Sequence, residues 1–127
     1  MKRYQSPLQI AESLSQTWSP QVISQFDDYY VKVASLKGSF VWHSHEEQDE
    51  LFLILKGVLV IEYEDGNVEL QTGDMHVVPR NTPHNPVADE ECLVMIIEHK
   101  TTAHTGKTES SSTRSIEEQL GSFIANR

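Results

Sequence analysis

The strongest constraint on the fold is a series of short β-prone segments that runs from about residue 22 to residue 97. β-Branched and aromatic side chains dominate these segments, and such residues favour extended strands. Asp65-Gly66 lies between two alternating segments, which is a typical hairpin signal. Many short strands with frequent turns indicate a barrel or a sandwich, so the sequence predicts an all-β domain. The predicted strands are 22–26, 29–36, 40–43, 51–55, 58–63, 68–70, 75–78 and 92–97.

Helical signals flank this β region on both sides. Ser6 and Pro7 suit the cap and the first turn of a helix, and apolar residues then recur on one side as far as Trp18. Near the other end, Ser115 followed by Glu118 resembles a capping box. The predicted organisation is a helical extension over residues 1–19, a barrel over 20–100, and a loop with a short C-terminal helix over 101–127.

Two separated segments carry side chains of the kind that bind transition metals. The first contains His43, His45 and Glu50, and the second contains His84. Alternation along a strand places His43 and His45 on one face, with their side-chain roots roughly 6.6 Å apart at two strand rises. Three imidazoles and a carboxylate suit a divalent transition metal that keeps open coordination positions. The sequence therefore predicts a metal site and says much less about a substrate.

The first of these segments resembles the first sequence motif of the cupin superfamily. Gly38, His43, His45, Glu50 and Gly57 match that motif, with one residue fewer than usual between Gly38 and His43. In the strand that follows, Glu50 shares its face with every second residue of an apolar run. A carboxylate that faces a barrel interior is costly unless it is paired or binds a metal, which agrees with a ligand role for Glu50.

The second segment resembles the second cupin motif. Gly73, Pro79 and His84 match it, whereas Asn81 replaces a glycine and Ala88 replaces the final asparagine. Asn tolerates a left-handed backbone better than most residues, so the change at Asn81 is mild. The asparagine lost at position 88 is not a ligand in the family. Both departures therefore leave the metal-binding set untouched.

This resemblance implies a cupin double-stranded β-helix, a jelly-roll barrel, with a metal inside one open end. The implied ligands are His43, His45, Glu50 and His84, and the implied ion is Fe, Mn, Ni or Zn. The wider pattern, with Tyr29-Tyr30 upstream and Thr105-Gly106 downstream, resembles the mannose-6-phosphate-isomerase-like cupins. Small cupins commonly form homodimers, so the resemblance also implies a homodimer.

Other titratable residues offer alternatives to this ligand set. Asp49 is the alternative carboxylate, although the pleat of a strand directs it to the face opposite Glu50. His76 is expected to be packed or on the surface, and His99 and His104 to be surface residues outside both motifs. If no metal binds, the motif histidines would be partly buried, hydrogen-bonded residues of a degenerate cupin.

The functional prediction is a metal-dependent enzyme, an isomerase, an epimerase or an oxygenase, that acts on an unidentified small polar molecule. The rival prediction is a non-catalytic cupin that binds or senses a small molecule around a structural metal. No general base beyond the ligands can be identified, so the catalytic residues are unassigned. Few cations accompany the motifs, which argues mildly against a phosphorylated substrate. These cations are Lys37, Lys56, Arg80 and Lys100.

Composition excludes several other classes of protein. The formal net charge is −9 and no cluster of Lys or Arg occurs, so a nucleic-acid partner is not expected. Purely apolar runs such as residues 51–55 are far too short to span a membrane. The single cysteine, Cys92, excludes an internal disulfide, and it precedes an apolar strand that favours a buried, inert thiol. A cytoplasmic location is the expectation.

Overall fold

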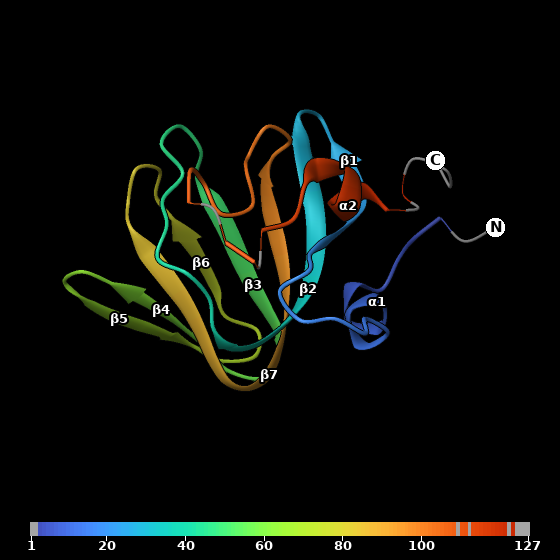
Figure 1. The fold of residues 1–127 in the computed structure, drawn as a ribbon. Coiled ribbons are helices and arrows are strands. Elements are labelled where there is room, and N and C mark those ends of the chain that lie inside the picture. Colours follow the sequence, from blue (N-terminus) through green and yellow to red (C-terminus); the bar gives the residue numbers. More distant parts are fainter. Residues whose placement is uncertain (1–2, 109, 112, 122, 124–127) are drawn as a thin grey trace.

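The computed structural model describes residues 3–108, 110–111, 113–121 and 123, and within them the chain is built mostly from strands (Figure 1). The all-β prediction is confirmed. The elements in chain order are α1 (Pro7–Glu12), β1 (Gln21–Phe26), β2 (Tyr29–Ser39), β3 (Glu50–Lys56), β4 (Leu59–Tyr63), β5 (Gly66–Leu70), β6 (Met75–Val78), β7 (His84–His99) and α2 (Ile116–Leu120).

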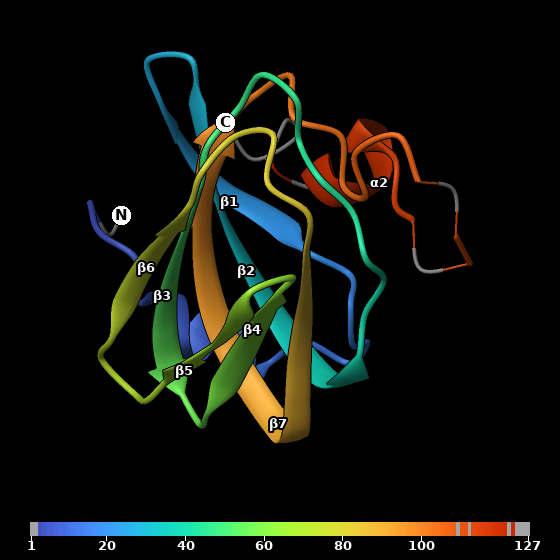
Figure 2. The same ribbon diagram turned by 90° about the vertical axis from the view of Figure 1, so that its left-hand side faces the viewer.

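The long strand β7 joins the two layers of the jelly roll. Its second half pairs with β2 and β3 in a sheet of order β1-β2-β7-β3-β6, in which all the pairings are antiparallel. Its first half pairs with β4, which in turn forms a hairpin with β5. Figures 1 and 2 show β7 bending sharply between these halves, so that one strand contributes to both walls of the interior.

The hydrophobic core fills the space between the two layers. Phe52 and Ile54 of β3 project into it, whereas Leu51 and Leu53 are only partly buried, as the alternation of a strand requires. The other core members come from both layers. They are Ala34, Leu36, Leu59, Ile61, Leu70, Val78, Ala88, Cys92, Val94 and Ile96.

A smaller apolar cluster lies on the outer face of the larger sheet, where α1 covers it. Ala11 of the helix packs there with Val33 and Leu93 from β2 and β7. Ser6 caps α1 by accepting a hydrogen bond from the Gln9 backbone N–H, as its sequence predicts. The helix ends at Glu12, however, so Trp18 lies outside it and adopts a positive φ of 55°.

One strand prediction is wrong, and another is correct but too short. Residues 40–43 form no strand, because Gly38 has a φ of 84° near the end of β2 and the chain then leaves the sheet, so that His43 makes only an isolated bridge with His84. The strand predicted over residues 92–97 is in fact the second half of β7. The sequence does not predict the first half of β7, because it contains Pro86 and three acidic residues at 89–91, and these residue types are uncommon in strands.

The C-terminal region follows its prediction of a loop and a short helix. Ser115 and Glu118 form the predicted capping box at the start of α2, with each side chain accepting from the other residue's backbone N–H. Figure 2 shows this region beside one end of the β layers. Within the described ranges, neither helix has the length and apolar character needed to cross a bilayer.

Candidate metal centre

Glu50 is the first residue of β3 and faces the barrel interior. It pairs in register with Val78 on one side and Glu98 on the other, and it is 6% exposed. Asp49, one residue earlier, points outward, where its carboxylate accepts hydrogen bonds from the backbone N–H and the side chain of Arg80. The pleat thus separates the two candidate carboxylates, and Asp49 lies outside the cluster that contains Glu50.

His43 and His84 are held together by the backbone. Each donates its N–H to the carbonyl oxygen of the other, at 3.0 and 2.9 Å. Each also places its Nδ1 against the carbonyl oxygen two residues earlier, Val41 for His43 at 2.8 Å and Thr82 for His84 at 2.9 Å. A carbonyl can only accept, so both Nδ1 atoms carry the proton and both Nε2 atoms present a lone pair to the interior.

The link between the two motifs continues through Asn81. Its backbone N–H donates to the carbonyl oxygen of His45 at 2.6 Å, and its φ is 56°. The residue that replaces the motif glycine therefore adopts the left-handed conformation that Asn tolerates. This bond ties the segment after β6 to the segment that carries His43 and His45.

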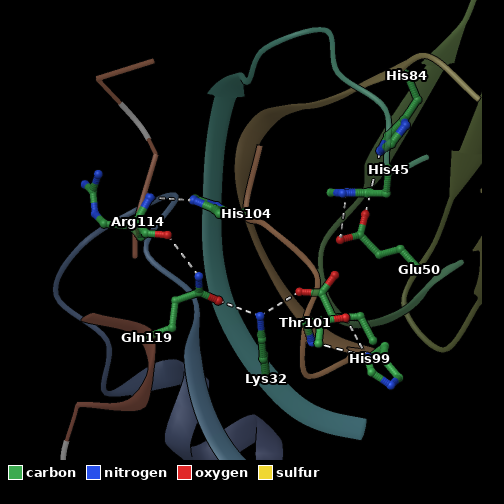
Figure 3. Close-up of polar contacts among 10 residues, drawn as sticks. Lys32, His45, Glu50, His84, His99, Thr101, His104, Arg114 and Gln119 are labelled. Atoms are coloured by element: carbon green, nitrogen blue, oxygen red, sulfur yellow. Dashed lines mark hydrogen bonds and ion pairs between the residues drawn. The ribbon is translucent and has the colours of Figure 1, made fainter. Parts of the chain in front are cut away.

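Four donor atoms converge in the interior, one each from His43, His45, Glu50 and His84, and all lie within 4.8 Å of one another. The two oxygens of Glu50 lie 3.7 Å from Nε2 of His45 and 3.6 Å from Nε2 of His84 (Figure 3). Both ring nitrogens of His45, and Nε2 of His84, are buried without a hydrogen-bond partner. Buried polar atoms are rarely left so, and a bound cation would satisfy Nε2 of His84 and one ring nitrogen of His45. The donor set therefore fits a transition metal ion.

Burial sets the protonation of these ligands. Desolvation, followed by the neighbouring charge of His84, lowers the pKa of His43 to about 4. Desolvation also lowers the pKa of His45. Neutral imidazole is the form that binds a metal, so these shifts favour binding at neutral pH.

Comparison with known proteins agrees with this geometry. The family model for the cupin domain matches residues 30–98. That segment contains most of β2, all of β3 to β6, most of β7 and all four converging residues. The chain belongs to the cupin family.

Three relatives illustrate the range of similarity. This cupin is 31% identical over 101 residues to the uncharacterised protein YdbB of Bacillus subtilis, covering 79% of this chain and 89% of that one. A crystal structure of a cupin-2 domain containing protein from Shewanella frigidimarina is 44% identical, with a TM-score of 0.68 and coverage of 69% and 86%. A 3-hydroxyanthranilate 3,4-dioxygenase from Neurospora crassa is 29% identical over 83 residues, which are 62% of this cupin and only 46% of the dioxygenase.

A second buried carboxylate lies beside the ligand set of this cupin. Glu98, opposite Glu50 in register, binds the ammonium group of Lys32 at 2.7 Å, and Lys32 also donates to Gln119 of α2 at 2.5 Å (Figure 3). Burial, and then the charge of Glu50, raise the pKa of Glu98 above its usual range. The parity of β7 was the available signal, because Glu98 shares a face with the core residues Val94 and Ile96.

A small cavity of about 30 Å³ adjoins the ligands. Its polar lining consists of His43, Glu50 and His104, and the rings of Trp18 and Phe40 stack across its edge with centroids 4.6 Å apart. His104, expected at the surface, instead lines this cavity. The remaining lining residues are Pro20, Ala34, Leu36, Phe52 and Ile96.

The other residues singled out in the sequence lie away from this cavity. His76 accepts from or donates to the hydroxyl of Tyr63 at 2.7 Å, a contact between β6 and β4. His99 lines a larger groove on the outer face of the sheet. Cys92 is fully buried, and desolvation raises the pKa of its thiol to about 11, which agrees with the inert role predicted for it.

Proposed function

We propose that this cupin binds one divalent transition metal ion through His43, His45, Glu50 and His84 and acts as a metal-dependent enzyme on a small molecule. The observation that carries the proposal is the convergence of four donor atoms from buried residues, of which those of His45 and His84 otherwise lack a hydrogen-bond partner. Fe(II), Mn(II), Ni(II) and Zn(II) all accept imidazole and carboxylate ligands.

Of the two reaction types that suit this ligand set, oxygenation fits better than isomerisation of a sugar phosphate. No residue that lines the cavity is Lys or Arg, so nothing there would hold a phosphate. Lys32, the nearest buried cation, is already engaged by Glu98 and Gln119. The similarity to a protein named as a dioxygenase supports the same choice.

The protein residues have separable roles in this proposal. Val41 and Thr82 orient the rings of His43 and His84 through their carbonyl oxygens. Trp18 and Phe40 exclude bulk water from the cavity. An Fe(II) ion held there would supply redox chemistry and open positions for a substrate and dioxygen.

The second candidate function is a non-catalytic cupin that binds a small ligand around a structural metal. The size of the cavity favours it, because about 30 Å³ accommodates a water-sized molecule and little more. The homodimer and the cytoplasmic location remain predictions from the sequence.

Elemental analysis of the untagged protein tests the proposed site. The wild type should retain one transition metal ion per chain, and His84→Ala should lower the affinity for that ion by at least about 100-fold. His99→Ala is the matched control, because His99 lies on the outer face, and it should keep the metal. A full complement of metal in His84→Ala would contradict the ligand assignment.

Oxygen consumption then separates the two candidate functions. The Fe(II)-loaded protein, with the Zn(II)-loaded protein as control, is supplied with a panel of small aromatic and aliphatic metabolites in an oxygen electrode. Metabolite-dependent uptake with Fe(II) alone supports an oxygenase. Absence of turnover together with zinc as the resident ion would favour the binding function.

A further inference from the structure

His104 is a fourth histidine at the candidate metal centre, although it belongs to neither cupin motif. It comes from the loop after β7 and lines the same cavity as His43 and Glu50. The ring of Phe40 contacts both imidazoles, with its centroid 5.1 Å from that of His104 and 5.5 Å from that of His43. Nothing in the ligand geometry requires His104, so its presence at the cavity needs a separate explanation.

The hydrogen bond to Arg114 fixes the tautomer of His104. The backbone N–H of Arg114 donates to Nδ1 of His104 at 2.9 Å, so Nδ1 must be the unprotonated nitrogen. The neutral ring therefore carries its proton on Nε2. Figure 3 shows the ring extending from Arg114 toward the barrel, and no acceptor for Nε2 is found among the described residues. A hydrogen-bond donor thus remains free at the cavity wall.

The loop that carries His104 is firmly packed on the ligand-bearing segment. Gly106 approaches Ser44 so closely that a Cβ at this position would collide with the Ser44 carbonyl oxygen, and its φ is 59°. Thr105 is buried and bonds to Thr113 at 2.8 Å. The imidazole is therefore held in place before any ligand arrives, as a binding group should be.

The charge state of His104 agrees with a role as a neutral donor. Burial is the main cause that lowers its pKa to about 4, and the charge of nearby Glu98, which opposes this shift, does not outweigh it. An imidazole that stays neutral at physiological pH polarises a bound oxygen atom without adding a second positive charge beside a metal ion.

We propose that His104 donates a hydrogen bond from Nε2–H to the ligand atom held at the metal centre. This inference rests on the proposed metal site. It limits the ligand to a small molecule whose coordinating atom also accepts a hydrogen bond, such as a carbonyl oxygen or a compact anion.

The tautomer can be measured directly in the wild-type protein. Long-range ¹H–¹⁵N NMR spectra of the Zn(II)-loaded protein at pH 7 should show His104 as the neutral Nε2–H form. Addition of azide, a compact anion that binds metals and accepts hydrogen bonds, should move the Nε2–H proton downfield. A Nδ1–H form, an imidazolium ion, or an Nε2–H proton that does not respond to bound azide would overturn the inference.

Azide affinity of the Co(II)-loaded protein, followed by visible absorption, provides the second test. His104→Phe removes the donor and should weaken azide binding about tenfold, since hydrogen bonds to charged groups are the strong ones. His104→Gln, whose amide N–H can replace Nε2–H, should stay within about threefold of the wild type. Equal affinity in the wild type and His104→Phe would contradict the inference.

Metal content, measured on the same samples, separates this inference from the proposed function. A wild-type protein without metal would refute the metal site itself. If the protein is fully loaded with metal and azide binds equally well to the wild type and to His104→Phe, only the role of His104 is refuted. If His104→Phe does not fold, the NMR measurement on the wild type decides the question.

Discussion

The two faces of the larger sheet present opposite kinds of hollow. The inner cavity measures about 30 Å³ and adjoins four buried potential ligands. The outer groove measures about 510 Å³, has an apolar floor that includes Leu51, Val77 and Ile97, and carries the exposed Asp49–Arg80 pair on its rim. The larger hollow thus lacks the convergent, desolvated polar groups that chemistry needs, and the size of a cavity alone does not locate the candidate site.

The ion pairs on the two faces differ in the same way. Lys32 and Glu98 are 1% and 5% exposed in their side chains, whereas Lys56 and Glu12 on the outside are 67% and 47% exposed. Water screens the outer pair and competes for its partners, so that pair contributes little. The inner pair has lost its hydration and depends on its partners entirely.

Removal of the lysine from each ion pair should give the largest difference in the free energy of unfolding between variants of the two faces. We expect Lys32→Met to lower the free energy of unfolding by about 3–5 kcal/mol, because the buried groups of Glu98 and Gln119 would both lose the ammonium group that they bind. Lys56→Met should cost at most about 1 kcal/mol. Urea denaturation at pH 8 measures both. The double variant Lys32→Met/Glu98→Leu should recover much of the lost stability. Equal losses in the free energy of unfolding for the two single variants would contradict the proposed difference between the buried and the exposed ion pair.

Acidification should weaken the metal-free protein through its inner histidines. The pKa values of His43 and His104 are about 4 in the folded protein, against 6.5 for an unperturbed histidine. Between these values the unfolded chain binds more protons, so stability is fully present above pH 6.5 and falls as the pH drops toward 4.

The expected loss is roughly 3 kcal/mol for each of the two residues. Urea denaturation in EDTA across this range measures it. His104→Phe should reduce the dependence by about one proton, that is by about 1.4 kcal/mol per pH unit. A pH dependence that is unchanged in this variant would show that His104 does not contribute.

The smallest expected difference in stability is between variants of two adjacent valines of β6. Val78 is 1% exposed and faces the core, whereas Val77 is 43% exposed and faces the outer groove. Val78→Ala should cost about 2 kcal/mol, from two buried methyl groups and the cavity they leave. Val77→Ala should stay within about 0.5 kcal/mol. Thermal denaturation measures both, and a larger loss at Val77 would mean that the outer groove is covered in solution.

Strand parity explains why much of the candidate site was predictable. The period of two placed Glu50 with Phe52 and Ile54 and separated it from Asp49, and the structure has this arrangement. The same rule applied to β7 would have placed Glu98 with Val94 and Ile96. Local alternation therefore carries reliable information wherever one face of a strand is buried.

Non-local contacts explain what the sequence did not predict. His43 lies outside any regular strand, and a bridge to His84, distant in the sequence, holds it in place. His104 reaches the cavity because Gly106 packs the loop against Ser44. No periodic pattern marks such a residue, and a loop rich in Thr, Ser and Gly is typical of an exposed segment. Contacts of this kind depend on the completed fold.

The long strand β7 also has a consequence for the order of folding. It pairs with β2 between residues as far apart as Tyr29 and His99, and its two ends bring His84 and Glu98 to the same end of the interior, on either side of Glu50. Pairings so distant in the chain form slowly, because a long loop must close before any contact is gained. We therefore expect the four donor atoms to come together only after β7 has paired with β2 and β3 in one layer and with β4 in the other. A metal ion should therefore bind late in folding and stabilise the completed barrel, rather than nucleate the folding of the chain.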